Sequence, residues 1–232
     1  MSLFPVVLGV RREVKGKPGE AFPASGLDAS SPELRARVLE RDGNTCQFCG
    51  FTSKKYQNLV FRNGNALDTR MENLATACIF CHQCFFLETV AGMRSGVLVW
   101  LPEMDAAALH HVCRAIYIAR ISQGPVADAA RIALDALISR RDEARKRLGT
   151  DDPAILAGVL QDFLEDKDYA MRSRKLDGIR LLPLDRRIIR DGDMEFNQFP
   201  QILAYWRSKD GPFGGVPPAG WEQLFDQVSS LA

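Results

Sequence analysis

The second half of the chain shows apolar residues at helical spacing. From Asp105 to about Ser122 apolar side chains recur every three or four positions, which predicts a helix with one buried face. A second helix is predicted from Pro125 to Leu148, with Gly149 at its C-terminal cap. We expect these two helices to pack as an antiparallel pair.

Two further helices and an aromatic tail are predicted beyond this pair. One helix begins at Asp152-Pro153 and another spans Asp168 to Asp177. The first of them carries the apolar residues Ile155, Leu156, Val159, Leu160, Phe163 and Leu164. Past Asp191 the chain is rich in aromatic residues, Gly and Pro, and contains a short amphipathic segment, Trp221 to Val228. The aromatic residues of this tail either dock onto a partner or fold back onto the chain's own core: Tyr205, Trp206, Phe213 and Trp221.

The first half contains shorter segments with β propensity. Val6 to Val14 predicts a strand, and Lys15 to Ser30 predicts a loop. Pro32 suits the first position of a helix that reaches about Arg41. An irregular hairpin is predicted between Gly50 and Ala77, and a strand from Val97 to Leu101.

The overall charge gives no reason to expect a nucleic-acid or lipid ligand. The 232 residues include 30 Lys and Arg against 29 Asp and Glu, a formal net charge of +1. A local excess of basic residues between Met171 and Arg190 could meet phosphates or an acidic partner, although a solvated face is the commoner outcome. The apolar N-terminus lacks the features of an export signal, and no apolar stretch is long enough to span a membrane. Any membrane contact is therefore expected through a partner.

The cysteines predict a metal site. Five of the six cysteines fall between positions 46 and 84, and four of them form two C-x-x-C pairs: Cys46, Cys49, Cys78 and Cys81. Each pair can turn two thiolates towards one tetrahedral ion, and the predicted hairpin would bring the two pairs together. We predict one structural zinc ion held by these four residues. With four thiolates the site is closed, because no position is left for water or phosphate.

His82 and Cys84 are competing ligands, and either could replace Cys81. The regular C-x-x-C turn favours Cys81, so Cys84 and Cys113 are predicted to be buried helix residues. His82 is interpreted as an exposed residue or one that lies just outside the ligand set. His110 and His111 are predicted to be structural.

The segment Glu72-Asn73-Leu74, followed by Cys78-x-x-Cys81-His82, resembles the zinc-stapled HNH endonucleases. Asn73 matches the central asparagine of that family and His82 its final histidine. The first histidine of the pattern falls at Val60 or Phe61, and neither side chain can act as a base or bind a catalytic ion. The resemblance therefore implies a treble-clef fold without nuclease activity, in which Asn73 ties the hairpin loop. An active nuclease with atypical residues, for example Asp68, Glu72 and His82 around a second metal, is an alternative.

The chain is more closely similar to the IcmJ/DotN family of type IVB (Dot/Icm) secretion systems. The motifs that carry this resemblance run from about Leu34 to Leu184: Arg41-Asp42, Cys46-Gln-Phe-Cys49-Gly50-Phe51, Asn73-Leu74, Cys81-x-x-Cys84-Phe85-Phe86-Leu87-Glu88, Leu101-Pro102-Glu103, Asp152-Pro153-Ala154-Ile155 and Ile179-Arg180-Leu181-Leu182-Pro183. The resemblance implies a non-enzymatic adaptor that binds the coupling ATPase beyond its motor domain, together with other coupling-complex subunits. Such a protein would be cytoplasmic and attached to the inner membrane through the coupling complex.

We predict an α+β fold, mainly helical, in which a zinc-stapled, treble-clef (HNH-like) module packs with a helical subdomain. The expected divisions are an N-terminal strand and loop (1–30), the zinc module (31–100), the helical subdomain (101–190) and the C-terminal tail (191–232). A nucleic-acid-binding zinc module is a further alternative. The sequence leaves open the partner segment, the oligomeric state, and the roles of residues 1–30 and 191–232.

Overall fold

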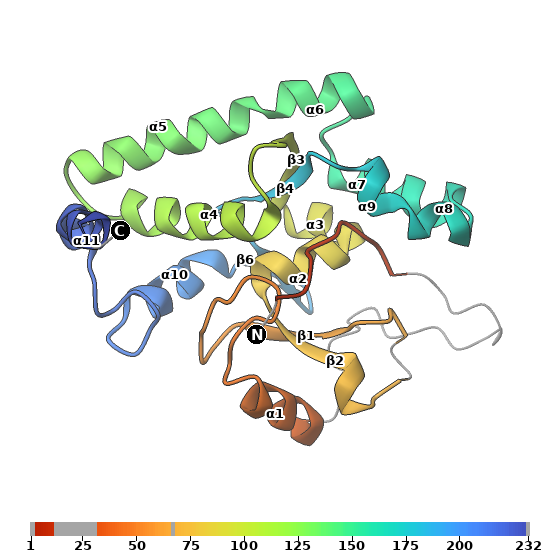
Figure 1. The fold of residues 1–232 in the computed structure, drawn as a ribbon, viewed down its shortest axis with the longest axis horizontal. Coiled ribbons are helices and arrows are strands. Elements are labelled where there is room, and N and C mark those ends of the chain that lie inside the picture. Colours follow the sequence, from red (N-terminus) through yellow and green to blue (C-terminus); the bar gives the residue numbers. More distant parts are fainter. Residues whose placement is uncertain (1–2, 12–31, 66–67, 231–232) are drawn as a thin grey trace.

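The computed structural model describes residues 3–11, 32–65 and 68–230. The fold is mixed, with about half of the chain helical and with small sheets, as the α+β prediction required. Figure 1 shows helices α5 and α6 along one side of the molecule and helix α1 with the β1–β2 hairpin on the opposite side. The helical elements are α1 (Pro32–Arg41), η1 (Met71–Asn73), α2 (Ile79–Phe85), α3 (Leu87–Met93), α4 (Ala106–Arg120), α5 (Pro125–Ser139), α6 (Arg141–Leu148), α7 (Pro153–Gly158), η2 (Val159–Phe163), α8 (Asp166–Ala170), α9 (Arg172–Lys175), α10 (Phe199–Arg207), η3 (Pro218–Gly220) and α11 (Trp221–Ser229). The strands are β1 (Gln57–Phe61), β2 (Leu74–Cys78), β3 (Gly96–Trp100), β4 (Ile179–Pro183), β5 (Ile188–Asp191) and β6 (Met194–Asn197).

The predicted hairpin and the helix before it are confirmed. Strands β1 and β2 pair antiparallel, in a register that places Val60 opposite Ala75. Helix α1 has the predicted bounds, and its Val38 packs against Leu59 and Leu74 of the two strands. The apolar side of α1 therefore covers one face of the hairpin.

Strand β3 confirms the predicted strand near Val97, but its partner was not predicted. Strand β4, Ile179–Pro183, pairs with β3 antiparallel, with Leu98 opposite Leu181. Both leucines are buried in one hydrophobic cluster. Strands β5 and β6 were not predicted either, and they form a separate antiparallel hairpin. In β6 the apolar residues Met194 and Phe196 alternate with polar ones over four positions only, and all four residues are exposed.

Helix α4 is close to its predicted bounds and lies beside α5, which confirms the predicted helix pair (Figure 1). The long helix predicted from Pro125 to Leu148 is divided into α5 and α6 at Arg140. The Arg140 carbonyl accepts a hydrogen bond from the Trp100 N–H of β3, so the turn is tied to the sheet. Gly149 has a φ of 76° and caps α6, as predicted.

Two other predicted helices are interrupted. The helix that begins at Pro153 changes from the α-helical turn α7 to the π-helical turn η2, and its apolar residues do not share one buried face. Leu156 and Leu160 are buried, whereas Phe163 is 80% exposed. The helix predicted from Asp168 to Asp177 is two short helices, α8 and α9, separated at Met171.

The N-terminal prediction requires a correction. Residues 6–11 form no strand in the structure, although Leu8 and Val10 are buried. Its backbone is held instead by isolated bonds, in which the Gly9 N–H donates to the Cys84 carbonyl and the Leu87 N–H donates to the Gly9 carbonyl. Residues 12–14 of the predicted strand and the predicted loop, Lys15 to Ser30, lie outside the described residues.

The aromatic tail folds back onto the core of the chain. Trp206 of α10 is fully buried and packs edge-on against Phe51, Phe80 and Phe199. Phe213 extends this cluster to Trp221 at the start of α11. Of the two alternatives for the tail aromatics, the structure therefore supports internal packing for these residues. None of the helices in the described ranges is long and apolar enough to cross a membrane.

Candidate metal centre

The four cysteines of the two C-x-x-C pairs meet at one point. Their sulfur atoms all lie within 4.8 Å of one another, and all four side chains are buried. The Sγ atoms of Cys49 and Cys78 are 3.7 Å apart. In a tetrahedral site with Zn–S bonds of about 2.3 Å, the sulfur atoms are separated by about 3.8 Å. The geometry therefore fits one metal ion held by four sulfur atoms.

Two local turns place these sulfur atoms. In the first pair, the Gly50 N–H donates to the Cys46 carbonyl, and Gly50 has a φ of 75°, which favours glycine. In the second pair, Cys78 ends β2 and caps α2, so that its sulfur accepts a hydrogen bond from the Cys81 N–H at 3.5 Å. An amide that donates to a sulfur atom stabilises the thiolate form that a metal requires.

The residues Arg41 and Asp42 join the end of α1 to the hairpin. The Arg41 guanidinium donates to the carbonyls of Met71 and Leu74, and an Asp42 carboxylate oxygen accepts from the Thr76 N–H at 2.9 Å. Burial opposes the ionised carboxyl, but hydrogen bonds from Arg41 and Thr76 hold the pKa of Asp42 below its ordinary value. These contacts fix the first cysteine pair against strand β2.

Arg114 of α4 is a fully buried cation beside the cysteines, and the sequence analysis missed it. Its Nη2 lies 2.7 Å from the Cys78 sulfur and 3.6 Å from the Cys49 sulfur. The guanidinium also covers the face of Phe51, with 4.0 Å between its carbon and the ring centroid. The Nε and Nη1 atoms have no hydrogen-bond partner in the described part of the chain. The sulfur atoms are therefore the main compensation for the buried charge.

The electrostatics of this contact favour ionised sulfur. Burial raises the pKa of Cys78, but the hydrogen bond from Cys46 and the charge of Arg114 bring this pKa below the ordinary value. Burial likewise opposes the charged form of Arg114, and the Cys78 and Cys49 sulfurs hold the pKa of Arg114 above its ordinary value. A four-thiolate site with a divalent ion carries a net charge near minus two, so one buried guanidinium removes about half of it.

The two histidines of α4 also contact the cysteine segments. His110 is fully buried, and its Nδ1 lies 3.2 Å from the Cys81 sulfur. Burial and the charge of Arg114 lower the pKa of His110 to about 3, so its ring is neutral. The Nε2 atom of His111 lies 2.6 Å from the Cys49 carbonyl oxygen. Both histidines thus contact the segments that carry the four cysteines, a position that was not predicted.

Cys84 and Cys113 stay outside the set of four. Cys84 is a buried residue of α2 whose sulfur donates to the Phe80 carbonyl, and burial raises its pKa. Burial raises the pKa of Cys113 to about 12. Both thiols are therefore neutral at ordinary pH, and the prediction that they are buried helix residues is confirmed.

His82 is buried, so the interpretation as an exposed residue is wrong. Its ring stacks on Phe86 with 4.5 Å between the centroids, and its Nε2 has no hydrogen-bond partner among the described residues. Burial lowers the pKa of His82 to about 3. Neither Asp68 nor Glu72 joins His82 in a metal-binding group within the described ranges, where the four cysteines are the only such group. Asp68 forms an ion pair with Arg70 instead.

The positions that resemble the HNH pattern have structural contacts. The Oδ1 atom of Asn73 accepts from the Asn63 N–H at 2.9 Å, and its Nδ2 donates to the Asp68 carbonyl at 2.8 Å. The prediction that Asn73 ties the hairpin loop is confirmed. Val60 is buried and Phe61 half-buried, both on strand β1.

We expect Asn73→Ala to lower the free energy of unfolding by about 1–3 kcal/mol, because Asn63 N–H and the Asp68 carbonyl lose their partner. Urea denaturation of the metal-loaded protein measures this loss. Glu72→Ala, an exposed change next to Asn73, is the matched control and should cost less than about 0.5 kcal/mol. Equal midpoints for the two variants would show that the Asn73 side chain does not hold the loop.

No family model matches the chain. The type 4 apparatus protein DotN of Legionella pneumophila subsp. pneumophila is 32% identical over 166 residues, which are 70% of this chain and 77% of DotN. The chain belongs to the IcmJ/DotN family. The resemblance inferred from the distributed motifs is therefore confirmed, and it extends well beyond the cysteine pairs.

In this IcmJ/DotN-family chain, much of the basic stretch from Met171 to Arg190 makes internal contacts. Arg172 donates to the Leu8 carbonyl and Arg180 to the Met104 carbonyl. Lys175 pairs with Asp168 at 2.7 Å. These three of the seven basic residues thus hold the N-terminal segment, α8 and α4 in place.

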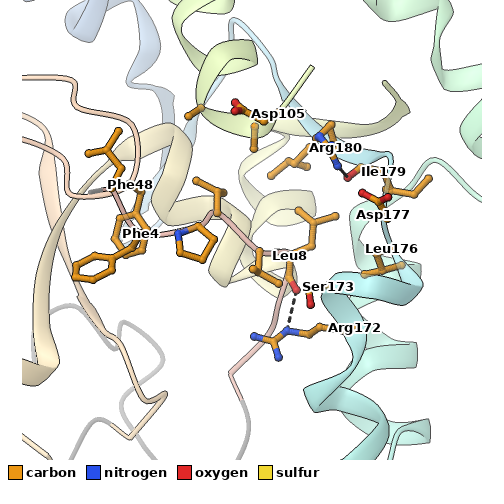
Figure 2. Close-up of a pocket in the computed structure, with 17 residues that line it drawn as sticks. Phe4, Leu8, Phe48, Asp105, Arg172, Ser173, Leu176, Asp177, Ile179 and Arg180 are labelled. Atoms are coloured by element: carbon orange, nitrogen blue, oxygen red, sulfur yellow. Dashed lines mark hydrogen bonds between the residues drawn. The ribbon is translucent and has the colours of Figure 1, made fainter. Parts of the chain in front are cut away.

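A cleft of about 450 Å³ lies between the N-terminal segment and the start of α4, α9 and β4 (Figure 2). Arg172 borders it, and the dashed line in Figure 2 marks its bond to the Leu8 carbonyl. Both carboxylates of the lining are occupied by backbone groups, since Asp105 caps α4 and Asp177 accepts from the Gly178 N–H. In this IcmJ/DotN-family protein the charged side chains that line the cleft thus each bind a backbone group of the chain.

Proposed function

We propose that this protein is a non-enzymatic adaptor subunit of a type IVB secretion coupling complex. The observation that carries the proposal is the 32% identity to a protein named as a type 4 apparatus protein, over 77% of that protein. The adaptor binds a segment of the coupling ATPase beyond its motor domain and contacts other subunits of the coupling complex. It acts in the cytoplasm and reaches the inner membrane only through that complex.

The metal in this proposal is one structural zinc ion. Cys46, Cys49, Cys78 and Cys81 would hold it, and the sulfur-only donor set is the one that structural zinc prefers. When bound, the ion supplies folding free energy and no reactive position. The zinc module, residues 31–100, is a treble-clef fold like that of the HNH proteins, and the helical subdomain, residues 101–190, packs on it.

The absence of nuclease activity is part of the proposal. A hydrolytic HNH site needs a base and an accessible cation, and the corresponding positions hold Val60 and Phe61 on strand β1. The buried, neutral ring of His82 also supports this proposal. Plasmid cleavage with Mg²⁺ or Mn²⁺ tests it. Cutting that depends on His82 would establish the enzyme, and salt-sensitive DNA binding lost in Arg172, Arg174 and Lys175 variants would establish a nucleic-acid module.

Co-purification tests the adaptor itself. We expect the full-length protein to co-purify with the coupling ATPase of its own secretion system, and to lose it when the segment beyond the motor domain is deleted. An ATPase with the motor domain deleted and that segment retained should still bind. Binding to the ATPase form that keeps only the motor domain, or no binding to either shortened form, would contradict the proposed role.

A further inference from the structure

Helix α7 and the π-helical turn η2 expose a row of apolar side chains, Ile155, Val159 and Phe163, here named the 155–163 stripe. Their exposed fractions are 56%, 42% and 80%. The neighbouring Leu156 and Leu160 are buried and anchor the helix to the core. Neighbouring residues of a helix are about 100° apart around its axis, so the stripe lies beside the anchored face and is partly or largely exposed to solvent. Exposed apolar side chains in a row commonly mark an interaction site.

The π-helical turn aligns the stripe. An α-helix rotates each residue by about 100°, so a residue four positions along drifts by about 40° around the axis. A π-helical turn has i→i+5 bonds and therefore rotates each residue by less. The step from Val159 to Phe163 falls within η2, so it offsets the drift from Ile155 to Val159. Single π-helical turns of this kind occur frequently at functional sites.

The surroundings of the stripe are acidic. Residues 151–168 contain six acidic residues and one lysine, a formal charge of −5, namely Asp151, Asp152, Asp162, Glu165, Asp166 and Asp168 against Lys167. Two of these acids are balanced by basic residues outside the range, since Asp151 is paired with Arg141 and Arg145 and Asp168 with Lys175. Asp162 is exposed beside Phe163 and forms none of the ion pairs found in the described ranges. A partner of positive charge would therefore be attracted to this face.

We infer that the 155–163 stripe binds a cationic amphipathic helix of a partner protein. Side chains spaced four apart form the ridges that pack into the grooves of another helix, and an exposed phenyl ring is a typical anchor. The backbone of α7 is hydrogen-bonded within the helix, so it offers no edge to an added strand. The inference rests on the proposed adaptor function, for which it names the binding surface and the chemistry of the bound segment.

Overlapping peptides that cover the non-motor region of the coupling ATPase test the inference by fluorescence anisotropy with the full-length protein. The tightest peptide should be amphipathic and positively charged. Phe163→Ser should lower the affinity for this peptide by at least about tenfold. Asp162→Lys should also lower this affinity, and the loss should be largest at low salt. Ile132→Ser and Asp135→Lys, exposed changes on α5, are matched controls and should bind like the wild type. Melting temperatures of all four variants check that the fold is intact.

The outcomes separate the two proposals. The inference that the stripe binds a cationic helix is overturned if the tightest peptide binds Phe163→Ser as tightly as the wild type. It is also overturned if that peptide is negatively charged. Neither result contradicts the adaptor role. If no ATPase peptide binds, a designed helix with leucines on one face and lysines on the other is the second probe. Binding of this helix that is lost in Phe163→Ser supports the stripe while the adaptor role loses its support. If the designed helix does not bind, the inference that the stripe binds a cationic helix is overturned.

Discussion

Replacing Cys78 by serine should release the metal ion and leave the protein aggregated or degraded. Cys78 ends strand β2, caps α2 and contributes its sulfur to the set of four, so one substitution removes a ligand from a closed site. A structural zinc ion contributes on the order of 10 kcal/mol to the folding of a small segment. This contribution is comparable to the roughly 5–15 kcal/mol by which a whole domain is usually stable.

The measurement is the metal content of the purified protein together with its thermal unfolding. We expect about one zinc ion per wild-type chain and well below that in Cys78→Ser and Cys46→Ser. Cys113→Ser is the matched control, because Cys113 is equally buried but lies outside the ligand set. It should keep its metal. A Cys78→Ser protein that is soluble and melts at the wild-type temperature would exclude a structural role for the ion.

Arg114→Leu is expected to have the next largest effect. The leucine fills part of the space but removes the positive charge that contacts the Cys78 and Cys49 sulfurs. Removal of one partner from a buried ionic contact typically costs about 3–5 kcal/mol, because the other partner is left without compensation. The metal-loaded variant should therefore unfold at a lower urea concentration and lose its ion to a weaker chelator.

Two further variants distinguish charge from geometry. Arg114→Lys keeps the positive charge but loses the planar contact with Phe51, so it should recover only part of the stability. Arg120→Leu, at the exposed end of the same helix, removes a surface ion pair with Asp185 and should cost less than about 1 kcal/mol. If Arg114→Leu and Arg120→Leu unfolded at the same urea concentration, Arg114 would not stabilise the metal centre.

Local patterns were enough to predict several elements. The two C-x-x-C turns, the capped helix α1, the loop held by Asn73 and helix α4 depend on residues close together in sequence. The set of four cysteines was also predictable, since a hairpin between the two pairs brings them together whatever packs around them. Distributed motifs were likewise sufficient to identify the IcmJ/DotN family.

Contacts between distant segments decided the rest. His110 and Arg114 are one helical turn apart, next to the apolar residues of α4, and this spacing was the one available signal that they face inwards. The sequence gives no indication of what lies opposite that face. Only the packing of α4 against α2 brings the guanidinium to the cysteine sulfurs and gives the buried charge its compensation.

The sequence by itself determined the set of four cysteines, the hairpin between them and the family, because these depend on spacing along the chain. The tertiary structure alone decided that β4 pairs with β3, that Trp206 lies in the core and that Phe163 faces solvent. The physical reason is the same in each case. An apolar residue has the same preference for burial wherever it stands, and the neighbouring segments determine which of several apolar faces is covered.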